Sequence, residues 1–186
     1  MNTRVKGFIY LLLSAVYFGF MPLLVKVICA DGSTIVGALF LRFALAIIPL
    51  YIYLKVRKVP MELSVEKGKK ILCVTVFGYG ITALLLYSAY DYMPSGMATV
   101  IHFGYPVFVL LGSLIFLRRR VPKLKIVCVG LCMIGIFLSY AGSGGEAKPM
   151  GFVFALISGM TYAFYILYLE VGGLQDIPAM KMIFYM

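Results

Sequence analysis

Acidic residues are scarce in this sequence of 186 residues, which contains 7 Asp and Glu against 17 Lys and Arg. None of them lies inside a long apolar stretch: Asp31, Asp91 and Glu146 fall in short turns, and Glu170 follows the end of one such stretch. The apolar stretches therefore offer no carboxylate pair for acid–base catalysis and no carboxylate relay for protons.

Metal-binding and disulfide-forming residues are also few, with one His and 4 Cys in the whole sequence. Cys128 and Cys132 are one helical turn apart, but no third ligand stands nearby, so packing inside the protein explains them better than a metal. All four cysteines lie within or beside apolar stretches, which is not the pattern of a secreted disulfide framework. We expect no cofactor and no metal, and a membrane-embedded enzyme is disfavoured because its catalytic groups are missing.

Charge of either sign is low, at 13% of residues, whereas 63% are hydrophobic and the mean hydropathy is +1.02. A soluble domain carries about 25% charged residues. The composition therefore predicts an all-α, polytopic membrane protein whose main contact is the lipid bilayer.

Six apolar stretches are long enough to cross a bilayer as helices, since about 20 residues at ~1.5 Å each span its hydrocarbon core. A seventh begins near Pro178 and reaches the last residue, Met186, before it is long enough to cross. The sequence thus predicts six complete transmembrane helices and the start of a seventh. The six stretches are approximately 7–28, 34–54, 71–90, 97–117, 125–141 and 150–169.

The basic residues gather in three segments that alternate with uncharged turns. Lys and Arg are retained on the cytoplasmic side of a membrane, so this pattern places the N-terminus in the cytoplasm of a multi-pass protein of the plasma or inner membrane. It also explains the net charge of +10 without a nucleic-acid partner. The three segments contain Arg4 and Lys6; Lys55, Arg57, Lys58, Lys67, Lys69 and Lys70; and Arg118, Arg119, Arg120, Lys123 and Lys125.

The first and sixth stretches resemble one another when the sequence is shifted by 144 positions. Five stretches then form one repeat, and because five is odd, a second copy enters the membrane from the opposite side, as in secondary transporters. We predict a first repeat at 1–145 and the start of an inverted second repeat at 151–186, within a protein of ten spans and about 290–300 residues. The identical pairs are Gly7/Gly151, Phe8/Phe152, Leu12/Leu156, Ser14/Ser158, Phe20/Phe164, Leu23/Leu167 and Val27/Val171.

Arg42 is the most unusual residue of the apolar stretches, because it stands near the middle of the second one. An arginine there costs about 2.5 kcal/mol or more to insert, so it faces a cavity or a partner. Two readings are open: an anchor for an anionic group of a substrate, or a structural bond to the carbonyl groups at the end of a neighbouring helix.

Four stretches carry polar or aromatic side chains on one helical face. One interpretation is a substrate cavity lined by hydroxyl groups and rings; the other is close helix packing and interfacial tyrosines. His102 is either a hydrogen-bonding group of the cavity or a structural histidine. With Arg42, the candidate cavity residues are Ser14, Tyr17, Tyr79, Thr82, His102, Tyr105 and Tyr162.

Several segments are similar to the EamA-domain transporters of the drug/metabolite transporter superfamily. They are Leu-Arg-Phe-Ala-Leu-Ala at 41–46, Ala-Leu-Leu-Leu-Tyr-Ser-Ala at 83–89, residues 95–100 and Tyr-Pro-Val-Phe at 105–108. The resemblance covers 7–145 as one repeat and 151–186 as the start of another. It departs at Arg118-Arg119, where the family usually has Glu-Arg. The family implies ten spans in two inverted halves, cytoplasmic termini, and export or exchange of small molecules such as amino acids, metabolites or drugs.

We therefore expect a secondary transporter that works by alternating access, and not an enzyme. The alternative is a non-transporting membrane protein or an inactive fragment, which needs a dimer or a partner chain to supply a second half. The strong charge bias allows only one orientation, so two copies cannot pair in antiparallel fashion. The 186-residue chain alone is expected to insert without transporting.

Overall fold

The computed structural model describes residues 3–30, 32–118, 121–142 and 148–186, and these ranges contain helices and no strands. The predicted all-helical class is confirmed. Arg119, Arg120, Asp31 and Glu146, which were used above to argue sidedness and turns, lie outside the described residues.

Five helical segments of the described residues are long and apolar enough to cross a membrane. They comprise α1 (Thr3–Ala30), α2 (Ile35–Val56), a third segment of three consecutive elements, a fourth of two, and α8 (Pro149–Val171). The predicted fifth span forms helix α7 (Lys123–Ala141), which is not among these five. The seventh stretch forms the short helix α9 (Ala179–Tyr185).

The third segment begins earlier than the hydropathy predicted and changes its winding partway. It runs from α3 (Val65–Cys73) through a π-helical stretch (Val74–Gly80) into α4 (Ile81–Ala89). Ser64 caps α3 by accepting a hydrogen bond from the backbone N–H of Lys67. The loop expected at 55–70 is therefore shorter, because its last residues form the first turns of a helix.

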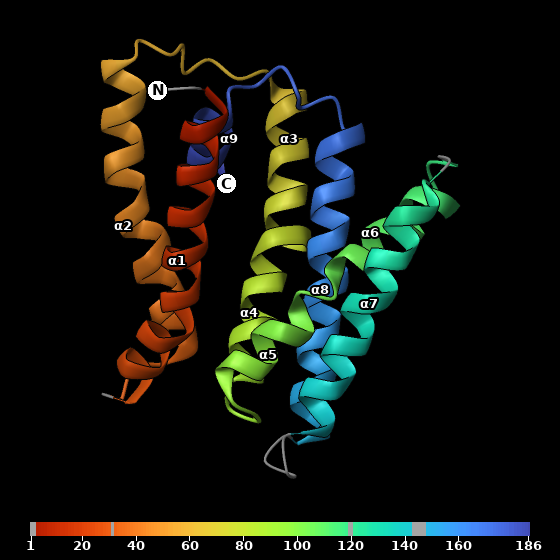
Figure 1. Ribbon diagram of the computed structural model, residues 1–186. Coiled ribbons are helices and arrows are strands. Elements are labelled where there is room, and N and C mark those ends of the chain that lie inside the picture. The colour runs from red at the N-terminus through yellow and green to blue at the C-terminus, as the bar shows by residue number, and fades with distance from the viewer. Residues whose placement is uncertain (1–2, 31, 119–120, 143–147) are drawn as a thin grey trace.

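The fourth segment is two helices, where a single helix was predicted over 97–117. α5 (Ser95–His102) and α6 (Tyr105–Ile115) are separated by Phe103 and Gly104. Pro106 explains the break, because it has no N–H to donate to the carbonyl of His102 and its ring crowds that carbonyl. The chain turns there, and α6 leaves the line of α5 (Figure 1).

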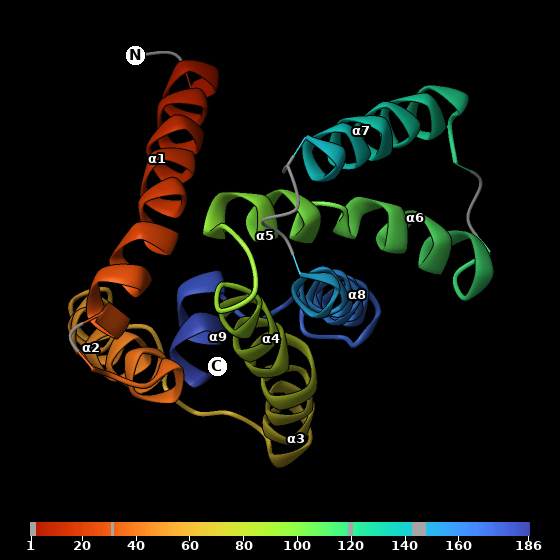
Figure 2. The same cartoon turned by 90° about the horizontal axis from the view of Figure 1, so that it is seen from below.

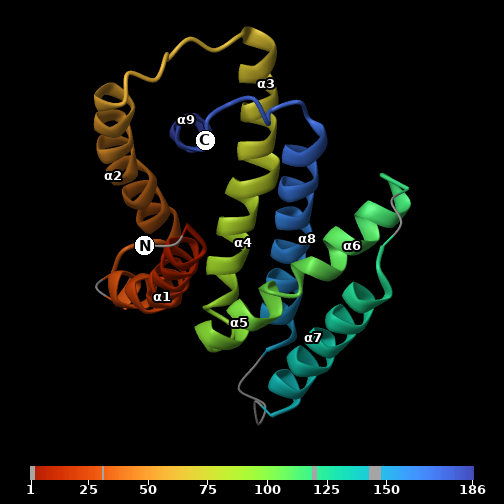
Figure 3. The ribbon, with the colours of Figure 1, turned by 45° about the horizontal axis from the view of Figure 1, so that its top comes forward.

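Helix α8 is the centre of the packing. It contacts the π-helical stretch, α4, α5 and α6, and seen from below it stands between α4 and α6, with α7 outside α6 (Figure 2). α1 and α2 form a separate pair, and α9 lies between α2 and the α3–α4 segment (Figure 3). The main buried cluster joins these parts through Val25, Leu39, Ala83, Leu86, Tyr87, Ala89, Met93, Ala98, Ile101 and Ala155.

Helices α1 and α8 run in opposite directions through the molecule (Figure 1). The start of α1, the α2–α3 connection and the α8–α9 connection lie at the upper end, and the α1–α2 and α4–α5 turns lie at the lower end. The basic residues at 55–58 and 67–70 thus lie toward the same end of the molecule as the start of α1 (Figure 1).

Candidate functional site

Six of the eight predicted cavity residues line one cavity of about 310 Å³. The cavity lies between α1, α2, the π-helical stretch with α4, the α5–α6 break and α8, so it is formed by parts of the chain far apart in the sequence. The six are Arg42, Tyr79, Thr82, His102, Tyr105 and Tyr162.

Arg42 is the polar centre of this cavity. It is half-buried at the eighth position of α2, about 10 Å from the start of the helix. Its Nη1 donates to the hydroxyl of Tyr87 at 2.8 Å, and its Nη2 donates to the hydroxyl of Tyr79 at 3.0 Å. The guanidinium also lies 5.6 Å from the ring centre of Phe43. Its hydrogen-bond partners are therefore tyrosine hydroxyls, where one of the two readings expected carbonyl groups.

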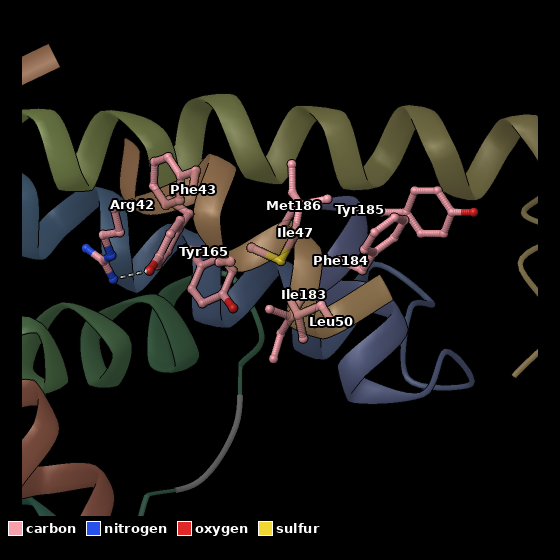
Figure 4. Close-up of a pocket in the computed structure, with 11 residues that line it drawn as sticks. Arg42, Phe43, Ile47, Leu50, Tyr165, Ile183, Phe184, Tyr185 and Met186 are labelled. Carbon is pink, nitrogen blue, oxygen red and sulfur yellow. Dashed lines mark hydrogen bonds between the residues drawn. The ribbon is translucent and has the colours of Figure 1, made fainter. Parts of the chain in front are cut away.

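A second cavity of about 510 Å³ shares Arg42 and Tyr79 with the first. It continues along α2 past Ile47 and Leu50 toward Ile183–Met186 (Figure 4). Arg42 stands at one end of this cavity, and the residues of α9 stand at the other (Figure 4). The two cavities thus meet at Arg42, which is exposed to both.

His102 is held in one orientation by α8. Its Nδ1 is 2.9 Å from the hydroxyl of Ser158, and that hydroxyl donates its only proton to the carbonyl of Ala155 at 2.6 Å. Nδ1 must therefore be the donor, which leaves Nε2 as a hydrogen-bond acceptor of the neutral ring. His102 is 3% exposed. The bond to Ser158 supports the interpretation as a structural histidine, and the place of His102 in the cavity wall supports the interpretation as a hydrogen-bonding group of the cavity.

Thr82 joins α4 to α8 beside the cavity. Its hydroxyl donates to the carbonyl of Gly78 at 2.6 Å and lies 2.7 Å from the hydroxyl of Thr161. This contact fixes the rotation of α8 relative to α4, and with it the position of Tyr162, one residue further along.

Aromatic rings connect the two cavities. Tyr105 meets Tyr162 edge to face with ring centres 4.8 Å apart, Tyr162 stacks on Tyr165 at 5.4 Å, and Tyr165 lies 5.8 Å from Tyr79. Such pairs are stabilising beyond their buried area, by about 0.5–1.5 kcal/mol each. The wall between the cavities is therefore a continuous row of tyrosines.

Two glycines bring α8 close enough to form this wall. A Cβ on Gly78 would lie 2.9 Å from Cβ of Tyr165, and a Cβ on Gly159 would lie 3.1 Å from the carbonyl oxygen of His102. Small residues allow such close approach between membrane helices. The α5–α6 break therefore lies directly against the backbone of α8.

The structure does not bring Ser14 and Tyr17 to the cavity. Both are exposed, and Tyr17 is 74% exposed. The N-terminal half of α1 is directed away from α4 and α8 (Figure 2), and it is Phe18, Met21 and Pro22 that line the cavity from this helix.

Tyr87 and Tyr90 line the cavity although they were not among the eight candidates. Tyr79, Thr82, Tyr87 and Tyr90 follow helical spacing on one polar face of the third stretch, and this spacing is the sequence signal for Tyr87 and Tyr90. Among the described residues, no group of three or more His, Cys, Asp or Glu could hold a metal ion.

The sequence of this chain is similar to a known protein family and to several known proteins. The profile described as "EamA-like transporter family" matches residues 5–141. An uncharacterized transporter of Clostridium kluyveri is 23% identical over 171 residues, which cover 86% of this chain and 54% of the relative. An uncharacterized transporter of Archaeoglobus fulgidus is 33% identical over 85 residues, 44% of this chain and 31% of the relative.

A third relative, an uncharacterized transporter of Synechocystis sp., is 30% identical over 90 residues, which cover 47% of this chain and 27% of the relative. The chain thus spans about half the length, or less, of the relatives it matches. No solved structure matches it.

Proposed function

Because this chain belongs to the EamA-like transporter family, we propose that it forms the substrate-binding part of a secondary transporter for small metabolites or drugs. The observation that carries the proposal is the cavity around Arg42, which combines one cation with hydroxyl groups and rings inside a bundle of apolar helices. Lipid-facing surfaces need no such groups, whereas a substrate pathway does.

The proposed mechanism is alternating access, with export or exchange of the substrate. The two cavities that meet at Arg42 support it, because they are separated by side chains and not by a helix. A change in the tilt of α9 or α1 could open one cavity and close the other. The α5–α6 break at Pro106 supplies a point where the wall can bend.

We further propose six membrane crossings, with α7 as the fifth and α9 as the start of a seventh, in the plasma or inner membrane with a cytoplasmic N-terminus. The basic residues at 55–58, at 67–70 and around α6–α7 support this orientation. The opposite directions of α1 and α8 support an inverted second repeat from 151. Phe18 and Tyr162, which the shift of 144 positions aligns, both line the cavity.

A second set of helices completes the transporter in this proposal, supplied by the same chain or by a partner. Two observations support it: the chain matches 54% of the C. kluyveri relative, and only 11% of an 18-residue apolar stretch within each of α1 and α2 is buried.

The test is made in cells that carry the gene naturally. Small molecules are measured inside the cells and in the medium for the wild type, a deletion strain, and deletion strains restored with the native gene or its Arg42→Gln variant. We expect at least one small molecule to accumulate in the deletion strain, and the native gene but not Arg42→Gln to reverse this. No gene-dependent redistribution of any compound, on deletion or overexpression, would refute transport.

A further inference from the structure

The charge of Arg42 has no acidic partner among the described residues. The ion pairs present there, Lys67–Asp176 and Lys70–Glu66, lie outside both cavities. Arg42 is surrounded instead by two neutral hydroxyls and the face of an aromatic ring. A cation inside a membrane span is costly unless it is neutralised. The cavity therefore carries one uncompensated positive charge.

The hydrogen bonds around Arg42 leave N–H and O–H donors available for a ligand. Tyr79 and Tyr87 both accept from the guanidinium, so each hydroxyl still has its own proton to donate. No onward acceptor for either proton is present among the described hydrogen bonds. The guanidinium itself keeps three of its five N–H groups. These donors are gathered around one guanidinium at the edge of the cavity, which favours binding of an anion.

The amount of charge and the shape of the donors restrict the anion. One guanidinium balances one negative charge, whereas a phosphate monoester would bring close to two into a wall without a second cation. The planar fork of arginine matches the two oxygens of a carboxylate. The rest of the wall offers the rings of Phe18, Phe103 and Tyr90. A cavity of about 310 Å³ holds a small molecule.

We propose that Arg42, Tyr79 and Tyr87 bind the carboxylate of a small organic monoanion whose apolar or aromatic body lies against the rings of the cavity. This inference rests on the proposed function, because it names the substrate class of the same cavity. It assigns Arg42 as the anchor and the two tyrosines as donors that also hold the guanidinium in place.

The direct test compares three probes that share a body and differ in charge: para-fluorophenylacetate, para-fluorophenylacetamide and para-fluorophenethylamine. The 186-residue chain is placed in nanodiscs of a zwitterionic lipid, and binding is followed by fluorine NMR, with empty nanodiscs to correct for partition into lipid. We expect the carboxylate to bind about tenfold or more tightly than the amide, since hydrogen bonds to charged groups discriminate by about that factor.

Variants assign this discrimination to residues. Arg42→Gln should bring the carboxylate to the affinity of the amide, and Tyr79→Phe and Tyr87→Phe should each weaken the carboxylate several-fold while leaving the amide unchanged. Arg57→Gln is the matched control, since Arg57 follows the same helix and lines neither cavity. Circular dichroism checks folding, and if Arg42→Gln does not fold, the two tyrosine variants decide, because they keep their rings.

If Arg42 had a purely structural role, the Arg42→Gln variant would keep the wild-type ratio of carboxylate affinity to amide affinity. The proposal is wrong if the wild type binds acid and amide equally, prefers the amine, or binds no carboxylate at millimolar concentration. Those results leave transport of a neutral or cationic compound intact, as the deletion strain would show. Conversely, carboxylate binding without any gene-dependent redistribution would remove the transporter function and keep the binding site.

Discussion

Individual hydroxyl groups decide how α8 is attached to its neighbours. Thr82 and Thr161 lie 2.7 Å apart, and Ser158 bonds His102 at 2.9 Å, so three short side chains fix α8 against α4 and α5. Between membrane helices such bonds contribute about 0.6 kcal/mol on average and up to about 1.7 kcal/mol. Their value for the cavity is orientation, because the neighbouring Tyr162 and Tyr165 follow the rotation of α8.

We predict that Thr82→Val destabilises the chain by about 0.5–1.7 kcal/mol through loss of the bond to Thr161. Unfolding in mixed micelles, followed by circular dichroism, measures the change. Thr75→Val is the matched control, because the Thr75 hydroxyl donates within its own helical segment, to the carbonyl of Ile71, and makes no bond to another helix among the described residues. A double-mutant cycle with Thr161→Val should show a coupling between positions 82 and 161; strictly additive effects would contradict the interhelical bond.

Among the elements, the π-helical stretch Val74–Gly80 has the largest effect on the site. It carries Tyr79, and its Gly78 touches the backbone of α8. In a regular helix, the eight residues from Tyr79 to Tyr87 correspond to a turn of about 80° and a rise of ~12 Å. The wider π-helical turn beside Tyr79 changes the angle between Tyr79 and Tyr87. The hydroxyl groups of both tyrosines reach the guanidinium of Arg42. π-helical turns are frequent at functional sites.

We expect Gly78→Ala to destabilise the chain by about 1–3 kcal/mol, because its Cβ would lie 2.9 Å from Cβ of Tyr165 and 3.3 Å from Cα. Gly130→Ala, in the middle of α7 with nothing within 4 Å of the added Cβ, is the control and should be neutral or slightly stabilising. Thermal unfolding in detergent compares the two. Equal behaviour of both variants would show that α8 can move away from Gly78 at no cost.

The elements could be predicted from the sequence further than the site could. Hydropathy and charge predicted the positions of the long helices, because burial in lipid depends on composition over about 20 residues. The π-helical stretch was not predictable, since it depends on how Gly78 packs against Tyr165 and leaves no mark in the hydropathy. The break at Phe103–Gly104 was predictable only in part. Pro106 indicates that the helix is disturbed near this position, but not that it divides into two separate helices.

The site shows the same limit at finer detail. Arg42 was found because a charge in an apolar stretch is conspicuous, and Tyr79, Thr82, His102, Tyr105 and Tyr162 were found as polar faces. Ser14 lies on the same face of α1 as Phe18, one turn away, yet only Phe18 reaches the cavity. Helical periodicity indicates which side chains share a face, but it does not indicate the tilt of the helix. The tilt of α1 decides which of these side chains reaches the cavity. The pairing of Arg42 with Tyr87 likewise needs the register between two helices.

At the scale of the whole molecule, the placement of charge predicts how the chain lies in the membrane. The basic segments at 55–58 and 67–70 and the start of α1 are at one end, and the α1–α2 turn around Ser33 is at the other. The difference in Lys and Arg between the two ends fixes one orientation during insertion.

We therefore predict that a cysteine at Lys58 is labelled only from the cytoplasm and a cysteine at Ser33 only from outside. The measurement uses a membrane-impermeant maleimide on intact cells and on inverted vesicles, in a variant whose four native cysteines are replaced by alanine. Labelling of both positions from the same side would contradict the topology, and labelling of each from both sides would mean that the chain inserts in two orientations.

In the proposed transport cycle, the charge of Arg42, which has no acidic partner in the part of the chain that the structure describes, has an electrical consequence. When the empty site switches from one side of the membrane to the other, it moves one positive charge through part of the membrane field. When the site is loaded with a monoanion, it moves no net charge. A full crossing of one charge corresponds to about 2.3 kcal/mol per 100 mV. A potential that is negative inside draws the empty site toward the cytoplasm, where it meets its anion again. If the chain works as proposed, the membrane potential resets the carrier for export, and collapsing that potential with an ionophore should slow the return of the empty site and leave the loaded step unchanged.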